Sequence, residues 1–367
     1  MLIDHSTYLK FKESAIQGRY VVNAQIINFL TTLRPEFTVE TIGASVEGRP
    51  IKSVTVGTGN QKVLMWSQMH GNESTTTKAV LDLLRFLESK DAIATALLRN
   101  NTIKIIPILN PDGAEAYTRF NANAVDLNRD AQTRTQPESK VLRDVYEDFQ
   151  PSFCFNLHDQ RTMYNVGDTS KPATVSFLAP SHDKARSISD TRRLSMQLIA
   201  AMNTELQKVI PGQMGRYDDA FNANCIGDTF QMLKTPTVLF EAGHFQEDYE
   251  RERTREYIAY ALIKALHCIG EDETKSYSEK SYFEIPENNK LFFDILIRNA
   301  QMINPSFTKD VGIVFSEVLK DGKITFQAKI EKTGRLDEYF GHRTYDGRVK
   351  GDLTSLKGQN FWELLKQ

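Results

Sequence analysis

Short apolar runs alternate with longer amphipathic stretches along most of the chain. Four runs are mostly apolar and predict buried strands: "KVLMW" at 62–66, "IKIIPIL" at 103–109, "FCFNL" at 153–157 and "TVLF" at 237–240. Their nearly continuous apolar character is typical of strands that are covered on both faces, as in α/β sheets.

Four amphipathic stretches lie between and after these runs and predict helices, at 74–89, 138–147, 185–208 and 248–269. In the first, Ala79, Val80, Leu83, Leu84 and Leu87 fall on one helical stripe. The last ends before Gly270, which is a suitable helix C-cap. Strands that alternate with helices predict an α/β sandwich, with the sheet between two helical layers.

The pattern changes after Gly270. The segment "EDETKSYSEKSY" at 271–282 is polar and charged, as in a linker, and residues 290–303 could form a helix. Further on, two alternating stretches flank Asp321-Gly322 and predict a β-hairpin. We therefore expect a large domain at 1–272, long enough to be a catalytic domain, and a small C-terminal α+β domain at 275–367. The sequence does not indicate the role of the small domain.

Charge and cysteine content narrow the class of protein. The chain has 45 basic and 47 acidic residues and a net charge of −2, so neither nucleic acid nor a membrane surface is an expected partner. The first twenty residues do not resemble a signal peptide, and no run approaches the roughly 20 apolar residues of a membrane span. The three cysteines are scattered and suit a reducing compartment. We expect a cytoplasmic protein.

A histidine and a glutamate stand where the first apolar run gives way to a helical pattern. His70 and Glu73 form an HxxE pair, but so do His244 and Glu247. Seven histidines and 47 acidic residues in 367 positions give about 0.9 such pairs by chance, so spacing alone does not choose between a metal site and an ordinary loop.

The strand pattern adds context. Hydrolytic zinc takes three protein ligands and leaves one position open for water. His70 and Glu73 follow one predicted strand, His158 follows another, and Glu241 ends a third. Side chains at the carboxyl ends of neighbouring parallel strands meet at one edge of the sheet. Each residue alone could equally be the first solvated position after its strand, but the coincidence of four favours a site.

Five short motifs, in this order, resemble the carboxypeptidase A-type zinc metallocarboxypeptidases over roughly residues 40–270. They are His70-Gly71-Asn72-Glu73, "NPDG" at 110–113, "VDLNR" at 125–129, "NLHD" at 156–159 and "LFEAG" at 239–243. The arrangement is similar to that of short bacterial members. The resemblance implies a mixed sheet of about eight strands between helices, and one zinc ion held by His70, Glu73 and His158.

The resemblance also implies roles for other residues. Glu241 would be the general base and Arg119 would stabilise the oxyanion. Asn128 and Arg129 would bind the terminal carboxylate of a peptide, and Tyr217 would contact the substrate from a mobile loop.

Three further acids and one histidine have less definite expected roles. Asp159 would orient a ligand, or else be solvated. Asp228 lies where the family places its specificity pocket and could select a basic or amino-bearing side chain, although a helix-capping or solvated aspartate is the simpler alternative. His244 and Glu247 would lie outside the ligand set, next to it or at a helix start.

Two alternatives to a peptidase stay open at this point. Aspartoacylase and succinylglutamate desuccinylase relatives use a similar ligand set to cleave N-acyl amino acids, and they have a β-rich C-terminal domain. A non-enzymatic binding protein on the same fold would lack a ligand or the base, whereas all four residues are present here. The expected substrate is a peptide, including one derived from peptidoglycan. Residues 275–367 are expected to be dispensable for the metal site.

Overall fold

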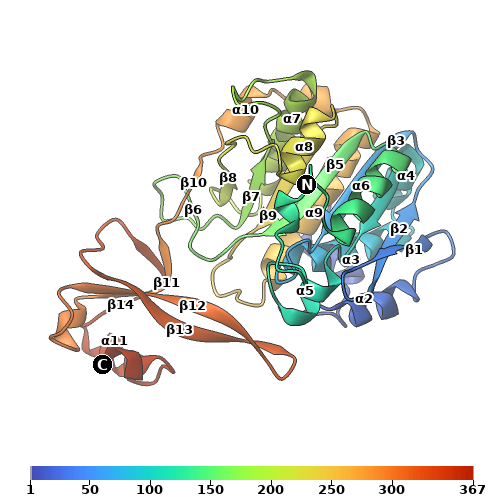
Figure 1. Ribbon diagram of the computed structural model, residues 1–367. Coiled ribbons are helices and arrows are strands. Elements are labelled where there is room, and N and C mark those ends of the chain that lie inside the picture. Colours follow the sequence, from blue (N-terminus) through green and yellow to red (C-terminus); the bar gives the residue numbers. More distant parts are fainter. Residues whose placement is uncertain (1, 367) are drawn as a thin grey trace.

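A computed structural model describes residues 2–366 and divides the chain into a large α/β unit and a smaller C-terminal sheet (Figure 1). The large unit is built on an eight-stranded mixed sheet in the order β1-β2-β4-β3-β5-β9-β7-β8. Its strands are β1 (Thr38–Ala44), β2 (Pro50–Val56), β3 (Gln61–Ser67), β4 (Asn101–Ile106), β5 (Phe153–Asp159), β7 (Val175–Leu178), β8 (Met214–Arg216) and β9 (Thr237–Ala242). The four strands expected from apolar runs are all present, as β3, β4, β5 and β9.

Helices cover both faces of this sheet, which confirms the predicted α/β sandwich. The helices are α1 (His5–Phe11), α2 (Asn23–Leu30), α3 (Thr75–Glu88), α4 (Ala92–Asn100), α5 (Pro111–Ala116), α6 (Pro137–Phe149), α7 (Asp190–Leu206), α8 (Ile226–Met232) and α9 (Glu252–Gly270). One core cluster joins α3, α4, α7 and α9 to one face of the sheet, and a second joins α6 and α8 to the other. The four predicted helices correspond to α3, α6, α7 and α9.

The centre of the sheet explains why chemically capable side chains converge. Strand β5 pairs in parallel with both β3 and β9, so all three end at the same edge. His158 on β5 lies directly opposite Glu241 on β9 in the strand register. The turn that holds His70 and Glu73 follows β3, between that strand and α3.

The C-terminal sheet has four strands in the order β13-β12-β11-β14. They are β11 (Phe292–Arg298), β12 (Asp310–Lys320), β13 (Lys323–Gly334) and β14 (Phe340–Asp346), and helix α11 (Lys350–Lys357) packs beside them. The expected hairpin is confirmed: Asp321 and Gly322 form its turn with φ angles of 50° and 71°. The helix expected at 290–303 is wrong, because half of that segment forms β11 and only residues 300–302 form a short 3-10 turn.

The boundary between the two units lies later than the predicted 272–275. Residues 274–289 form η2 (Thr274–Ser276), α10 (Lys280–Phe283) and β10 (Asn288–Asn289). Tyr282 and Ile285 belong to the core of the large unit, and β10 pairs with β6 (Asn165–Val166). The polar segment is therefore a packed connection, and the separate sheet begins at Phe292.

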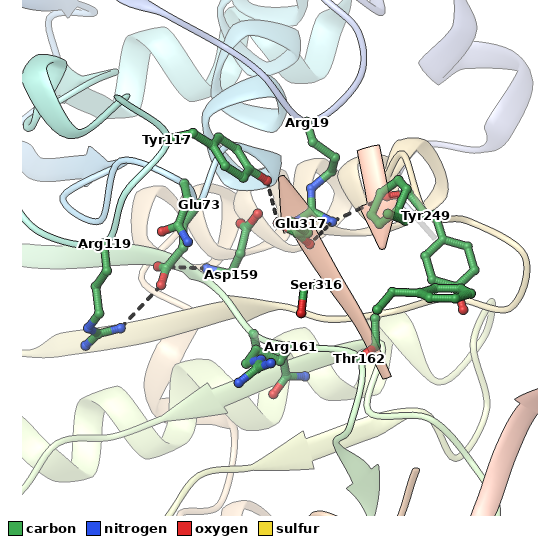
Figure 2. Close-up of a pocket in the computed structure, with 14 residues that line it drawn as sticks. Arg19, Glu73, Tyr117, Arg119, Asp159, Arg161, Thr162, Tyr249, Ser316 and Glu317 are labelled. Carbon is green, nitrogen blue, oxygen red and sulfur yellow. Dashed lines mark hydrogen bonds and ion pairs between the residues drawn. The ribbon is translucent and has the colours of Figure 1, made fainter. Parts of the chain in front are cut away.

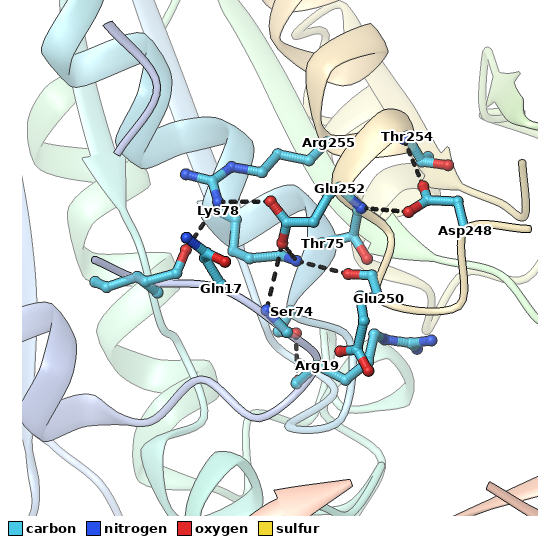
Figure 3. Close-up of polar contacts among 12 residues, drawn as sticks. Gln17, Arg19, Ser74, Thr75, Lys78, Asp248, Glu250, Glu252, Thr254 and Arg255 are labelled. Carbon is cyan, nitrogen blue, oxygen red and sulfur yellow. Dashed lines mark hydrogen bonds and ion pairs between the residues drawn. The ribbon is translucent and has the colours of Figure 1, made fainter. Parts of the chain in front are cut away.

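The segment before α2 ties the starts of α3 and α9 together (Figure 3). The Lys78 ammonium donates to Glu252 at 2.6 Å, and Ser74 Oγ donates to the Arg19 carbonyl at 2.6 Å. Arg19 is buried, so this network fixes a cation near the carboxyl edge of the sheet. None of the helices in the described part of the chain combines the length and the apolar character needed to span a bilayer.

Candidate metal centre and active site

The three predicted ligands converge at the carboxyl edge of β3 and β5. His70 Nδ1 lies 2.9 Å from a Glu73 carboxylate oxygen, and His158 Nδ1 lies 2.8 Å from the other. The two histidine Nδ1 atoms are 3.1 Å apart. Both imidazoles are 2% exposed, so the cluster is shielded from bulk water on most sides.

This donor set fits a zinc ion. Two ring nitrogens and a carboxylate lie together, and their ligand atoms are all within 4.8 Å of one another. His, His and Glu are ligands that catalytic zinc accepts, with a fourth position left for water. Burial raises the pKa of Glu73, but His70 and His158 outweigh this effect and hold the pKa well below its usual range. The carboxylate is therefore ionised and ready to bind a cation.

Asp126 supports the ligand His70 through a contact with its imidazole ring. The sequence analysis did not single out this residue. Its carboxylate lies 3.0 Å from His70 Nε2, on the far side of the ring from the cluster. Such a contact fixes the tautomer that leaves Nδ1 free to bind metal. Asp126 belongs to the "VDLNR" motif, so its position in that motif, two residues before Asn128, was the available signal.

Two glycines explain why the HGNE and NPDG motifs occur together. A Cβ at Gly71 would lie 1.9 Å from the main-chain carbon of Gly113, so the two turns touch through their backbones. Asn110 strengthens this contact, because its side chain accepts from Gly113 N at 2.9 Å and donates to the Met69 carbonyl at 3.1 Å. The second motif thus supports the turn that presents His70.

Asp159 is buried and supports the turn that contains Glu73. Its carboxylate accepts from Thr75 N at 2.8 Å and from Thr76 N at 3.2 Å, in the first turn of α3. The main-chain N–H of Asp159 donates to Glu73 at 3.2 Å. The expectation of a residue that orients a ligand describes this position better than a solvated acid does.

Glu241 faces the same cavity as the ligands. One of its carboxylate oxygens is buried and has no hydrogen-bond partner in residues 2–366. Burial, with the nearby carboxylates of Glu73 and Asp159, raises its pKa well above the usual value. A carboxylate of raised pKa accepts a proton readily near neutral pH, as a general base requires.

The two predicted arginines differ in their contacts. Arg119 donates to Asp126 at 3.0 and 3.1 Å, and its guanidinium also lies 3.6 Å from Glu73. Arg129 is exposed, and within the described residues it forms no ion pair. Asn128 accepts from Ile226 N at 3.2 Å, which fixes its side chain against the start of α8.

Tyr217 and Asp228 line the same cavity as Arg129. Tyr217 lies beside Tyr164, with ring centroids 5.4 Å apart, and burial together with Glu241 raises its pKa. Asp228 is buried and accepts from Asn222 N at 2.8 Å, so it is not the solvated residue of the simpler alternative. Burial raises the pKa of Asp228 to about 6.

The second HxxE pair lies outside the metal cluster, as expected. The His244 ring packs against His342, with centroids 4.2 Å apart, and Glu247 forms an ion pair with Arg343. Both partners belong to β14. This pair therefore takes part in the contact between the large unit and the C-terminal sheet.

Two cavities meet at the metal cluster. One has a volume of about 420 Å³. It is lined by the predicted site residues His70, Glu73, His158, Glu241, Asn128, Arg129, Tyr217 and Asp228. The other, of about 350 Å³, leads to the C-terminal sheet, and Figure 2 shows its residues. Glu73, Arg119, Asp159, Gln160 and Arg161 line both cavities. Nothing in the sequence indicated that Arg161 and the residues of β12 would line the second cavity.

Comparison with known proteins shows which family part of the chain is similar to. Residues 24–133 match the zinc carboxypeptidase family model, peptidase family M14. The predicted resemblance is thereby confirmed for the segment with His70, Glu73, Asp126 and Arg129. His158 and Glu241 lie beyond that match, and it is the fold that brings them close to His70 and Glu73.

Individual relatives agree with the family match. Carboxypeptidase E of Caenorhabditis elegans is 34% identical over 149 residues, which cover 32% of this chain and 31% of that protein. Carboxypeptidase 2 of Trichophyton rubrum is 28% identical over 102 residues, 27% of this chain and 19% of that protein. The chain thus spans between about a fifth and a third of the length of these curated relatives.

A solved structure shares the fold across more of the chain. The metallo-carboxypeptidase from Burkholderia cenocepacia superposes with a TM-score of 0.55 at 21% identity, and the match covers 68% of this chain and 69% of that one. At this identity the likeness concerns the fold alone.

Proposed function

We propose that the protein is a zinc-dependent metallocarboxypeptidase, with one zinc ion per chain, that hydrolyses the C-terminal amide bond of a peptide. The observation that supports this most strongly is the convergence of His70, Glu73 and His158 with a fourth acid, Glu241, beside them in one cavity. A cytoplasmic location, suggested by the three cysteines that form no disulfide, is part of the same proposal.

Each residue around the cluster has a chemical task in this reaction. A zinc ion held by His70, Glu73 and His158 would lower the pKa of a bound water to about 7 and would polarise a carbonyl group. Glu241 takes the proton from the attacking water and returns it to the leaving amine. Arg119, whose guanidinium lies 3.6 Å from Glu73, would stabilise the oxyanion that develops on the substrate.

The cavity beyond the cluster is the proposed site of the C-terminal residue. Arg129 has no carboxylate partner of its own in the described chain, so its guanidinium is free to bind the terminal carboxylate through paired N–H donors. Tyr217 closes part of the same cavity. Asp228, buried in its lining, would favour a lysine or diaminopimelate side chain, which extends the proposal to peptides derived from peptidoglycan.

A substrate panel on zinc-loaded protein tests this function. It compares peptides with a free C-terminus, muropeptides with diaminopimelate, and N-acyl amino acids. Release of a C-terminal amino acid supports the proposal, whereas cleavage of acyl amino acids without cleavage of peptides would establish the deacylase alternative. Elemental analysis of wild type and His158→Ala tests the ligand set, and an unchanged zinc content in the variant would remove His158 from it.

A further inference from the structure

Part of β12 has one unpaired edge. The pairing of β12 with β11 ends at Ile313, whereas its pairing with β13 continues to Lys320. Beyond Ile313, β12 therefore has a neighbouring strand on one side only within residues 2–366. An unpaired edge presents main-chain N–H and C=O groups that can bind another extended chain.

The hairpin geometry determines which groups point outward. In an antiparallel pair, residues alternate between bonding their partner strand and facing away from it. Phe315 N donates to the Asp294 carboxylate on the β11 side at 2.7 Å, so Phe315 faces away from β13. The same alternation turns the main-chain N–H and C=O of Glu317 away from β13, toward the side on which β12 has no neighbouring strand among the described residues.

The Glu317 side chain anchors this edge to the large unit. Its carboxylate accepts from the Tyr117 hydroxyl at 2.5 Å and pairs with buried Arg19 at 2.9 Å (Figure 2). On the same hairpin, Phe315 and Phe326 pack against Tyr249, with centroids 5.4 and 5.3 Å away. The edge is thus held in one place, as a binding surface requires.

The free edge lines the second cavity, which continues from the metal cluster. Phe315, Ser316 and Glu317 line this cavity, together with Gln160, Arg161 and Thr162. Residues 160–162 directly follow β5, which ends with His158 and Asp159. Glu73 and Arg119 line the end that the two cavities share.

We propose that the peptide residues before the scissile bond bind as an added strand along the free edge of β12. This inference rests on the proposed carboxypeptidase function. If the C-terminal residue occupies the cavity with Arg129 and Tyr217, the rest of the peptide leaves the cluster through the other cavity. Strand addition uses main-chain hydrogen bonds and so accepts varied sequences. The C-terminal sheet thereby becomes part of the substrate site.

A substrate series on the unmodified protein tests strand addition. N-acylated peptides with the same two C-terminal residues are lengthened one residue at a time. We expect kcat/KM to rise about tenfold or more as the peptide reaches β12. Replacing single amides by esters should then lower kcat/KM about 3- to 10-fold at alternate positions only, because alternate residues of a strand face one neighbour.

Two substitutions at one position provide matched variants. Glu317→Pro removes the outward N–H and the carboxylate but no ladder bond to β13, whereas Glu317→Ala removes the carboxylate alone. We expect the proline variant to lose more of the length dependence than the alanine variant. If the proline variant does not fold, the ester series on the wild-type protein still tests strand addition.

The outcomes separate the two proposals. Failure to cleave peptides of any length would overturn the carboxypeptidase function itself. Cleavage that is independent of peptide length, or ester effects without alternation, would overturn strand addition alone. Equal length dependence in the two Glu317 variants would also overturn it.

Discussion

Two glutamates six positions apart, Glu241 and Glu247, have contrasting surroundings. Glu241 lines the cavity of the metal cluster, and one of its carboxylate oxygens has no hydrogen-bond partner among the described residues, whereas Glu247 is paired with Arg343 at the surface. Glu241→Gln should keep zinc and lower kcat on the order of 10²–10⁴-fold, because glutamine matches the shape but accepts no proton. Steady-state kinetics and zinc analysis measure this.

The matched control is Glu247→Gln. This change removes an exposed ion pair, which contributes about 0–1 kcal/mol, and should leave kcat within about threefold of wild type. A Glu241→Gln enzyme with wild-type turnover would exclude Glu241 as the base.

Asp126 should matter for metal affinity although it is no ligand. Asp126→Asn removes the negative charge that faces His70 Nε2. Loss of such a partner typically weakens metal binding about 10- to 100-fold. Competition with a chelator gives the zinc dissociation constant, and an unchanged constant would show that the contact does not support the ligand.

Arg129 should separate free-acid from amidated peptides. A charge-assisted contact with a terminal carboxylate contributes about 1.5–3 kcal/mol. Arg129→Ala should therefore lower kcat/KM on a free-acid peptide roughly 10- to 150-fold. Amidation of the same peptide should cost wild type a similar factor, and the two losses should not add, because both remove one interaction.

The control for Arg129 is Arg134→Ala, at an exposed position nearby that lines neither cavity. It should keep the wild-type ratio of acid to amide rates. Equal wild-type rates on the acid and the amide would contradict the exopeptidase proposal.

At this scale, the sequence could identify residues but not their contacts. His70, Glu73 and His158 stand at strand ends in recognisable motifs, and the structure brings them together. Asp126 lies 56 positions from His70, so nothing local indicates that they touch. The exposure of Arg129 is likewise set by the packing of distant segments.

At the level of elements, the start of α3 links stability to the metal site. Asp159 accepts from two N–H groups of the first turn of α3, directly after Glu73. Asp159→Ala should lower the unfolding free energy by about 1–2 kcal/mol, as loss of a helix cap does. It should also weaken zinc binding, because the turn that presents Glu73 loses its support. Urea unfolding and chelator competition measure the two effects.

Asp91→Ala is the matched control, because Asp91 caps α4 through Ile93 N at 2.8 Å and lines neither cavity. It should cost similar stability and leave zinc affinity unchanged. If Asp159→Ala behaved in the same way, Asp159 would be only a cap.

The elements that sequence patterns predicted well are those with an unambiguous period or turn. The β12–β13 hairpin has Asp321-Gly322 at its turn, and α9 has a long apolar stripe. The segment of β11 fits both a strand and a buried helix, because a short, densely apolar run lacks a decisive period. Its pairing with β12 and β14 selects the strand, and that pairing depends on residues far along the chain.

At the scale of the whole molecule, the C-terminal sheet is joined to the large unit at several points. His342 Nε2 lies 2.8 Å from the Thr162 carbonyl, and its ring stacks on Phe292 with centroids 4.4 Å apart. Tyr249 donates to Asp294 at 2.9 Å. Since the three metal ligands lie between residues 70 and 158, the prediction that residues 275–367 are dispensable for zinc still stands. Substrate binding, in contrast, would depend on these residues if the peptide binds along β12.

The histidine pair at this junction predicts a pH dependence of stability. Burial lowers the pKa of His342 to about 4, and it lowers that of His244 well below its usual value. The nearby Arg251 cation acts in the same direction on both rings, and Glu247 opposes it only at His342. Both imidazoles are therefore neutral when the two units are packed together, whereas each takes up a proton near pH 6.5 in the unfolded chain.

The sign of the effect follows from proton binding. Between pH 6.5 and 4 the unfolded state binds more protons than the folded state, so the unfolding free energy falls as the pH falls through this window. For His342 alone the loss at pH 5 is about 2 kcal/mol. His342→Gln keeps a donor toward Thr162 but does not titrate, so it should lose less stability than wild type between pH 7 and 5. Urea unfolding of both proteins at the two pH values measures the difference, and equal losses would show that His342 takes up its proton without disturbing the junction.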